Sequence, residues 1–329
     1  MTLGQQNLRI QKWVVALAVT LFAVKIAAYF LTHSVAILTD ALESIVNVVA
    51  GFFGLYSLYL SAKPRDEDHP YGHGKIEFIS AAVEGTMILI AGVLIIIESI
   101  QALISPRELH ELDYGILLVA STAALNYIVG TICVRTGTKN NSMALMASGK
   151  HLQTDAYSTI GIVLGLLLIF FTDIQWLDSV VAVLFSFVII FSGLKIIRQS
   201  IAGIMDESDM LLLTELVKLL NENRKENWID LHNVRIIKFG GTLHLDAHLT
   251  IPWYLNVHEA HVEIETIARL VRTKFGPSLE LFVHSDGCLD FSCRICDKQD
   301  CAVRQFAFQR KVEWTVQNLV KDTKHDIDS

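Results

Sequence analysis

The segment at residues 150–155 reads Lys-His-Leu-Gln-Thr-Asp, and an almost entirely apolar run follows it as far as Thr172. His151 and Asp155 are four residues apart, so on a helix they lie on one face, one turn from each other. The helix is long enough to cross a lipid bilayer, where ionisable side chains are costly and usually functional. An imidazole and a carboxylate that point the same way form half of a metal site. The other half must come from another segment.

A second long apolar run, from Ser34 to Leu60, carries polar residues with the same spacing. Glu43 and Asn47 are four residues apart, and Asp40 lies one turn before Glu43. Two ligands from each of two helices would form a tetrahedral pocket for a divalent ion. The alternative is helix–helix hydrogen bonding, since polar groups inside a membrane find partners. Two pairs with one spacing favour the metal site.

The composition predicts that most of the chain lies in a membrane. Hydrophobic residues make up 52% of the 329 residues and are concentrated before Gly203, which is unusual for a soluble protein. Six segments are long enough to span a bilayer, at residues 13–32, 34–60, 77–103, 112–134, 143–172 and 176–197. Lysine and arginine are concentrated in the connections on one side, so the positive-inside rule predicts both termini in the cytoplasm. The net charge of −7 argues against a nucleic-acid partner.

The connection at residues 63–75 is expected to be a loop, because two prolines and two glycines interrupt it. It contains Asp66, His69 and His73, at spacings of three and four residues. Two imidazoles and a carboxylate form a suitable set of zinc ligands. The alternative is a solvated polar loop that covers the cytoplasmic mouth, and spacing alone does not decide between the two.

After Gly203 the composition changes and predicts a small α+β domain over residues 204–287. Its expected elements are a helix at 209–223, strands at 233–239 and 242–251, a helix at 257–274 and a strand at 279–284. Half of the chain's twelve histidines lie here together with Asp286, at positions 232, 244, 248, 258, 261 and 284. Several histidines on adjacent strands favour a metal site over a scatter of surface histidines.

The remaining residues, 288–329, carry four cysteines in the pattern C-x4-C-x2-C-x4-C, at Cys288, Cys293, Cys296 and Cys301. Thiols in a cytosolic domain stay reduced, so this cluster predicts zinc or a related soft metal rather than disulfides. An iron–sulfur cluster is the alternative, although its usual cysteine spacings differ. A last helix is expected at about residues 305–320.

These motifs together resemble the cation diffusion facilitator family over about residues 10–287. The matching stretches are SVAILTDALES at 34–44, HPYGHGKIE at 69–77, the His151-x3-Asp155 pair and the helix–strand–strand–helix–strand domain. The chain looks most like the bacterial zinc and iron efflux members, which are homodimers that exchange a divalent cation for protons. The resemblance implies a membrane all-α six-helix bundle in the inner membrane at residues 1–203. It also implies a cytoplasmic αββαβ domain, ferredoxin-like or metallochaperone-like.

The resemblance also implies roles for individual residues. The transport site would consist of Glu43, Asn47, His151 and Asp155, with Asp40 as a further candidate, and the loop site of Asp66, His69 and His73. A cytoplasmic site at the dimer interface would use His232, His248, His261, His284 and Asp286. Lys75 and Asp206 match a pair that locks the membrane domains of two subunits together.

One departure from the family pattern bears on the metal. Glu43 and Asn47 stand where the bacterial efflux members carry two aspartates, so the site has one negative charge fewer. Zinc is favoured because His151 is present, and iron, cobalt and manganese remain open.

We therefore expect a secondary active transporter rather than an enzyme, with zinc as the exported ion and as a structural or regulatory ion. His151 and Asp155 must lose protons to bind the metal, so proton-coupled antiport is a natural consequence. A membrane-anchored metal sensor or store would share the cytoplasmic sites but leave the membrane site without a role. A channel would show passive flux, and an intramembrane metalloprotease would need the H-E-x-x-H motif, which the sequence lacks.

Overall fold

The computed structural model describes residues 3–32, 35–104, 112–172, 176–277 and 279–327. The chain divides into two compact units, Met1–Met205 and Asp206–Ser329, and each is described by itself. The predicted boundary at residue 203 lies two residues before this division. Some side chains within the helices lie outside the description, among them those of Asp40 and Glu43.

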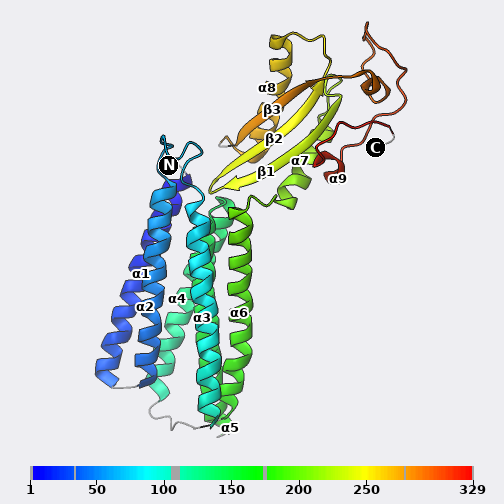
Figure 1. Ribbon diagram of the computed structural model, residues 1–329. Coiled ribbons are helices and arrows are strands. Elements are labelled where there is room, and N and C mark those ends of the chain that lie inside the picture. Colours follow the sequence, from blue (N-terminus) through cyan, green and yellow to red (C-terminus); the bar gives the residue numbers. More distant parts are fainter. Residues whose placement is uncertain (1–2, 33–34, 105–111, 173–175, 278, 328–329) are drawn as a thin grey trace. The chain divides into compact units, whose positions relative to one another are not determined.

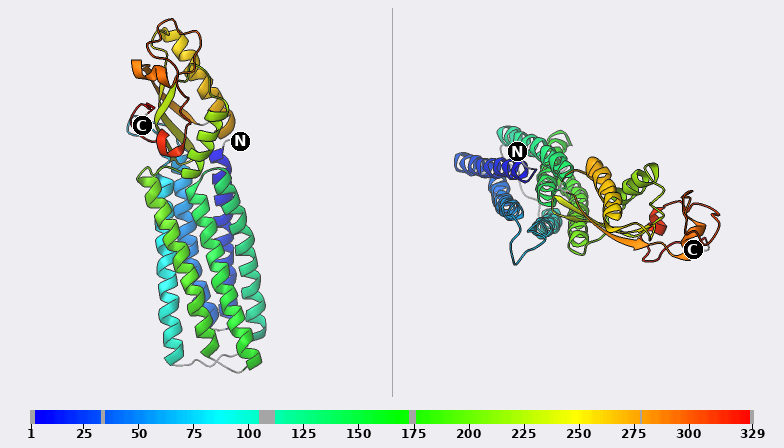
Figure 2. Two further views of the ribbon diagram at one scale, coloured as in Figure 1. Left: turned by 90° about the vertical axis from the view of Figure 1, so that its right-hand side faces the viewer. Right: turned by 90° about the horizontal axis from the view of Figure 1, so that it is seen from above.

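The first unit is a bundle of long helices that run side by side (Figures 1 and 2). Its described part contains α1 (Leu3–Thr32), α2 (Val35–Ser61), α3 (Ile76–Ile104), α4 (Leu112–Lys139), α5 (Met143–Thr172) and α6 (Trp176–Ile204). The shortest has 27 residues and the longest 30. At 1.5 Å per residue each is about 40–45 Å long, which exceeds the hydrocarbon core of a bilayer, about 30 Å.

Apolar surface on these helices fits contact with lipid. Three described stretches have the length and hydropathy of a membrane span by themselves, namely Gly4–Val24, Ile76–Gln101 and Ser186–Ile204. Large aromatic side chains such as Phe53 and Phe191 are exposed on the bundle. A soluble protein rarely leaves so much contiguous apolar surface in water, so the bundle is suited to a bilayer.

Glycines set close helix crossings next to the predicted transport residues. α4 packs mainly on α5, and a Cβ atom on Gly130 would lie only 2.8 Å from the carbonyl oxygen of Gly149. α3 packs mainly on α6, where a Cβ atom on Gly193 would lie 2.9 Å from the carbonyl oxygen of Gly85. Small residues let helix backbones approach in a membrane, and Gly149 thereby fixes α5 two residues before His151.

The second unit has the predicted order of elements, α7 (Met210–Glu222), β1 (Asp230–Phe239), β2 (Thr242–Ile251), α8 (Val257–Phe275) and β3 (Glu280–Gly287). β1 and β2 pair antiparallel, and β2 and β3 pair parallel, in the sheet order β1-β2-β3. The hairpin turns at Gly240, whose φ of 62° lies in the left-handed region that glycine adopts readily. β3 ends at Gly287, three residues later than predicted, so it includes Asp286.

The core of this unit lies between the helices and one face of the sheet. Alternate residues of β2, Leu243, Leu245 and Leu249 among them, pack with Leu216 of α7 and Val271 of α8. Because side chains alternate along a strand, the even-numbered residues of β2 point away from this core. His244 and His248, two of the predicted histidines, therefore lie on the other face of the sheet.

The predicted helix at 305–320 is wrong for most of its length. Residues 305–315 are not helical, and α9 comprises only Val316–Leu319, after the short 3-10 helix η1 (Asp290–Arg294). The Thr315 side chain accepts a hydrogen bond from the Asn318 amide and so caps the start of α9. Trp314 is buried in the domain core, with the Arg224 guanidinium 3.9 Å from its ring centroid. This anchor holds the preceding chain in a non-helical course, because tertiary contacts outweigh helix propensity.

Candidate metal sites

α2 and α5 bring together three of the predicted transport residues. Nδ2 of Asn47 donates a hydrogen bond to Oδ2 of Asp155 at 2.5 Å. Oδ1 of Asn47 lies 2.8 Å from Nε2 of His151. An amide oxygen only accepts hydrogen bonds, so His151 donates from Nε2. The amide of Asn47 thus bridges the imidazole and the carboxylate, while the predicted ligand Glu43 and the candidate Asp40 have side chains outside the described part.

A small pocket adjoins this bridge. His151, Thr154 and Asp155 of α5 line one side, and apolar residues of α3 and α6, including Ile88 and Ile189, line the other. Nδ1 of His151 is buried and has no hydrogen-bond partner among the described atoms. If the Asn47 amide moved away, Nε2 of His151 and Oδ2 of Asp155 would be available to bind a cation in this pocket.

A second polar network lies one turn before His151, and sequence reasoning did not assign it. Ser148 Oγ donates to Oε1 of Glu84 at 3.0 Å and accepts from Nε2 of Gln11 at 3.1 Å. The same Gln11 amide is 3.2 Å from the carbonyl oxygen of Gly51. The network therefore ties α1, α2, α3 and α5 together beneath the transport residues. Glu84 is fully buried, its Oε1 accepts from Ser148, and its Oε2 has no hydrogen-bond partner among the described residues.

The loop between α2 and α3 brings Asp66, His69 and His73 together as the spacing predicted. Donor atoms of all three lie within 4.8 Å of one another. Nδ1 of His69 lies 2.9 Å from Oδ1 of Asp66, and Nε2 of His73 lies 3.2 Å from Oδ2. The hydrogen bond from the His69 side chain lowers the pKa of the Asp66 carboxyl. Electrostatic attraction to His69 and His73 lowers it further. The three groups form a largely exposed site that can bind a divalent ion.

In the second unit, the sheet aligns three predicted histidines across its strands. His232 of β1 is paired with His248 of β2, which is paired with His284 of β3. Asp286 follows two residues later on the same face of β3. Donor atoms of His232, His248 and Asp286 lie within 4.8 Å of one another, and Nε2 of His284 lies 3.7 Å from Oδ1 of Asp286.

The spacing of this cluster fits a metal better than a set of hydrogen bonds. Oδ2 of Asp286 lies 3.5 Å from Nε2 of His232 and 3.6 Å from Nδ1 of His248. These distances are too long for good hydrogen bonds, and among the described residues the buried Oδ2 has no hydrogen-bond partner. Ligands at about 2.0–2.1 Å around a tetrahedral zinc ion are separated by about 3.4 Å. The cluster therefore already has nearly the dimensions of such a site.

Residues that sequence reasoning missed surround the cluster. Asp230 lies 3.4 Å from Nδ1 of His232 and 2.5 Å from Nδ1 of His325, and both carboxylate contacts are buried. Burial by itself raises the pKa of Asp230, but hydrogen bonds from His232 and His325 lower it overall. A carboxylate behind a ligating histidine fixes the orientation of its ring and raises its basicity. Asp230 lies on the Nδ1 side of His232, and the opposite nitrogen, Nε2, faces Asp286.

A lysine from the end of the chain also reaches the cluster. Nζ of Lys324 lies 3.5 Å from Oδ1 of Asp286 and donates to the carbonyl oxygen of Gly287 at 3.1 Å. Nothing in the local sequence pattern indicates this contact, because the chain leaves the domain at Cys288 and returns after an irregular excursion.

Comparison with known proteins identifies the architecture. The model of the cation efflux transmembrane domain matches residues 12–205, and that of the cation efflux protein cytoplasmic domain matches residues 211–288. The chain belongs to the cation diffusion facilitator family. It is therefore a membrane transporter of divalent metal cations.

Several relatives support this assignment. The chain is 32% identical to an uncharacterized transporter of Synechocystis sp., over 79% of this chain and 84% of the relative. It is 25% identical to the manganese efflux system protein MneS of Bacillus subtilis, over 78% of this chain and 88% of the relative. It is also 25% identical to the cation-efflux pump FieF of Serratia proteamaculans, over 83% and 90% respectively.

Two predicted features of this cation diffusion facilitator remain predictions. His261 is exposed on α8 and is not one of the three residues whose donor atoms lie close together. Lys75 and Asp206 belong to separately described units, so their predicted contact across a dimer stays a prediction.

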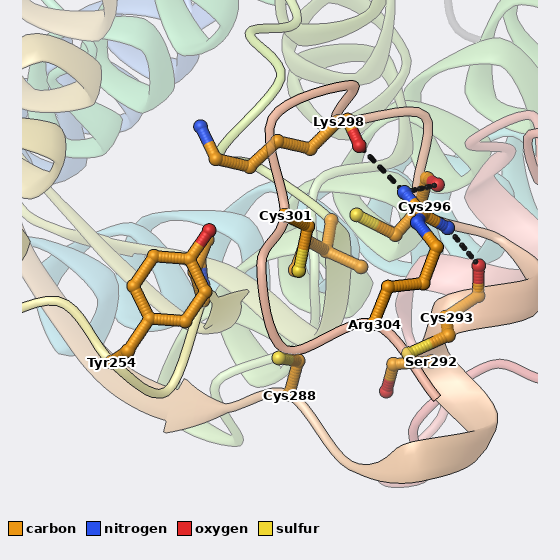
Figure 3. A pocket seen from close by; sticks show the side chains of 10 residues that line it. Tyr254, Cys288, Ser292, Cys293, Cys296, Lys298, Cys301 and Arg304 are labelled. Atoms are coloured by element: carbon orange, nitrogen blue, oxygen red, sulfur yellow. Dashed lines mark hydrogen bonds between the residues drawn. The ribbon is translucent and has the colours of Figure 1, made fainter. Parts of the chain in front are cut away.

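The cysteine segment begins where the matched cytoplasmic domain ends. Cys288, Cys293, Cys296 and Cys301 are free thiols and line one pocket together with Tyr254 and Arg304 (Figure 3). Burial raises the pKa of the Cys288 and Cys296 thiols, and the neighbouring cysteines raise it further. A divalent cation would reverse this effect by stabilising the thiolates.

Proposed function

We propose that this transporter exports zinc from the cytoplasm in exchange for protons, and that metal binding in its cytoplasmic domain regulates it. In this proposal all six long helices span the bacterial inner membrane, and both termini are cytoplasmic. The protein acts as a homodimer whose cytoplasmic αββαβ domains are ferredoxin-like. Its other partners are the lipid bilayer, the metal ion and protons.

The observation that carries the proposal is the bridge between Asn47, His151 and Asp155. These side chains come from two helices of the efflux domain and meet beside a pocket. A cation bound by Nε2 of His151 must replace the proton that this nitrogen donates to Asn47. Metal and proton therefore compete for one atom, which is the requirement for exchange of the two ions across a membrane.

Alternating access supplies the direction of transport. In secondary transporters, helices move around a fixed site near the middle of the membrane, so that the site faces one side at a time. Cytoplasmic metal would load the site after passing the Asp66, His69 and His73 loop. Protons from the outer side would then release the ion by protonating His151 and Asp155.

The cytoplasmic cluster supports regulation by metal. An ion held by His232, His248 and Asp286 would favour the conformation and dimer geometry in which these groups are close. His284, and His261 from α8, are the remaining predicted ligands at the interface. Removing Asp286 is expected to weaken the dependence of flux on cytoplasmic metal without abolishing flux, since the transport residues lie in the other unit.

Manganese is the second candidate for the exported ion. Imidazole and a single carboxylate favour zinc, whereas amide and carboxylate oxygens suit harder ions such as manganese. Asn47 adds an amide oxygen to the set, and one relative is named a manganese efflux system protein. Iron and cobalt are also compatible with mixed nitrogen and oxygen ligands.

The test is metal flux into proteoliposomes with an imposed pH gradient, in which zinc, iron, cobalt and manganese are compared. Asp155→Ala should abolish gradient-driven flux. Gln153→Ala is the matched control, because Gln153 is also buried on α5 but donates to Thr131 of α4. Flux of an ion other than zinc would correct the substrate. Metal binding without flux in the unmodified protein would replace the transporter proposal with a metal sensor or store.

A further inference from the structure

The four cysteines after β3 gather around one pocket although twelve residues lie between the first and the last. Figure 3 shows their side chains arranged around this pocket, which Ile229, Tyr254 and Arg304 also border. Cys296 is buried, and the other three are partly buried. None of the four forms a disulfide. Chance placement of four reduced thiols around one hollow is improbable, because cysteines without a shared role have no reason to converge.

Hydrogen bonds to its backbone and to one sulfur hold the loop around the thiols. The Arg304 guanidinium donates to the carbonyl oxygens of Cys293 at 3.0 Å, Cys296 at 3.1 Å and Lys298 at 2.6 Å. The amide of Gln305 donates to Sγ of Cys293 at 3.5 Å. Hydrogen bonds from backbone amides to sulfur orient and stabilise a thiolate ligand. Arg304 and Gln305 therefore give the loop a shape suited to metal ligation.

The far end of the excursion is anchored where Trp314 and Leu319 are buried in the domain core, but the part around the cysteines has little regular structure. Between Cys288 and Ile327 the regular structure consists of η1 and the four-residue α9. A small apolar cluster of Ile229, Ile295 and Cys296 attaches the loop to the domain. A long excursion with so little regular structure and core usually needs a cross-link or a structural metal.

We propose that Cys288, Cys293, Cys296 and Cys301 bind a structural zinc ion that is distinct from the transported ion. Four thiolates favour a soft cation, and zinc accepts them in a closed tetrahedral site without redox chemistry. Each thiol loses its proton to solvent as it binds, so the site carries two net negative charges. The sulfurs must approach to about 3.8 Å from one another, given Zn–S bonds of about 2.3 Å. They are not among the groups whose donor atoms lie within 4.8 Å, so the loop contracts around the ion.

This zinc ion would fix the start of an excursion whose end reaches the histidine cluster. Cys288 follows Gly287 directly, and Lys324 returns to the Gly287 carbonyl oxygen. The ion thus closes the chain near the point to which Lys324 and His325 return. Closing a loop reduces the conformational freedom of the segment within it. The zinc ion therefore restricts residues 288–301, the first part of the excursion that returns to the histidine cluster at Lys324.

Thiol protection in the unmodified full-length protein tests the site without any mutation. The protein is purified in detergent under reducing conditions, treated with chelator, and alkylated with and without added zinc. Zinc should slow alkylation of the four cysteines by about tenfold or more, because a ligated thiolate is a poor nucleophile. Cys133, buried in α4, is the internal reference, and zinc should leave its rate unchanged. Equal alkylation rates with and without zinc would overturn the proposal.

Metal content separates this site from the transport site. Cys301→Ser should lower zinc retained after dialysis by one ion per chain, whereas Cys133→Ser should not. Asp155→Ala should lose flux but keep the zinc-dependent thiol protection, so failure of the transport proposal leaves this test intact. Disulfides among the four cysteines in protein isolated from membranes without reductant would refute the zinc site. Iron and sulfide in the purified protein would refute it as well.

Discussion

Lys324 places a positive charge in a cluster that is otherwise suited to a metal cation. Its Nζ lies 3.5 Å from Oδ1 of Asp286, whose Oδ2 faces His232 and His248. We predict that Lys324→Gln, which keeps most of the side-chain length but removes the charge, increases the affinity of this cluster for zinc. The ammonium acts as a built-in competitor, because it and the ion are both stabilised by Asp286.

The magnitude follows from Coulomb's law. A zinc ion about 2 Å from the Asp286 carboxylate would lie about 5 Å from the Lys324 nitrogen. The repulsion between charges of +2 and +1 at this distance is about 1.7 kcal/mol in water and several times larger at an effective dielectric constant of 20. Lys324 is partly exposed and can move away, so the lower value applies. Removal of the charge should then tighten binding roughly 10- to 30-fold.

The assay is competition for zinc between the full-length protein and a fluorescent chelator, with Asp155→Ala in all variants to weaken the transport site. Lys321→Gln is the matched control, because it removes the same charge from an exposed position three residues earlier. In an Asp286→Ala background, Lys324→Gln should have no effect on zinc affinity. Equal affinities for the Lys324 and Lys321 variants, or a gain that persists without Asp286, would refute the electrostatic argument.

Three further predictions concern the remaining polar contacts. Asp209→Ala should destabilise the cytoplasmic unit by about 1 kcal/mol in thermal unfolding, because Asp209 caps α7, whereas Asp209→Asn should keep most of the cap. Burial raises the pKa of Asp209, but hydrogen bonds from Lys238 and two α7 amides lower it overall, so its stabilisation is complete above about pH 4 and is lost at lower pH. Glu84→Ala should lower the free energy of unfolding of the membrane unit by about 1–3 kcal/mol, and with it the melting temperature, because the Ser148 hydroxyl loses its acceptor. Glu84→Gln, which retains an acceptor oxygen, should cost less in the same heating assay. Arg304→Lys should speed alkylation of the four cysteines, because the single ammonium nitrogen does not span the carbonyl oxygens that the two guanidinium nitrogens reach.

The fold was largely predictable because its elements carry local signals. The expected helix at 257–274 is α8 at Val257–Phe275, whose start is fixed by a capping box between Asn256 and Glu259. Strand β2 agrees with the prediction at both ends, because alternating hydrophobicity and the Gly240 turn define it. The prediction of a helix at residues 305–320 was wrong because local signals do not determine the path of this segment. Trp314 is fixed by contacts from distant parts of the chain, and no local pattern indicates them.

Clusters within one short segment were also easier to predict from sequence than clusters formed by separate strands. Asp66, His69 and His73 lie in one short loop, so their spacing in sequence predicted that they would be close, and they are together in the structure. Alignment of His232 with His248 depends on a β-bulge between His232 and Arg235, which changes the register of β1. Sequence periodicity does not locate a bulge, so the gathering of histidines was predictable and their exact pairing was not.

The contact between Asp230 and His325 illustrates the limit of sequence reasoning. The two residues are 95 positions apart, and between them lie the hairpin, α8, β3 and the irregular tail. Their pairing depends on the path of a segment with almost no regular structure. A histidine near the end of a chain resembles a solvated residue until that path is known.

Asn47 connects the chemistry of the membrane site to its departure from the bacterial pattern. An amide can donate to Asp155 and accept from His151 at the same time, whereas a carboxylate has no hydrogen to donate. An aspartate at this position would face Asp155 across 2.5 Å and would need a cation or a proton between the two groups. With asparagine, the three groups are held together by hydrogen bonds alone. At the proposed transport site, a metal ion would therefore displace a neutral bridge rather than neutralise a repelling pair, and an ion that accepts the amide oxygen as a ligand would be favoured.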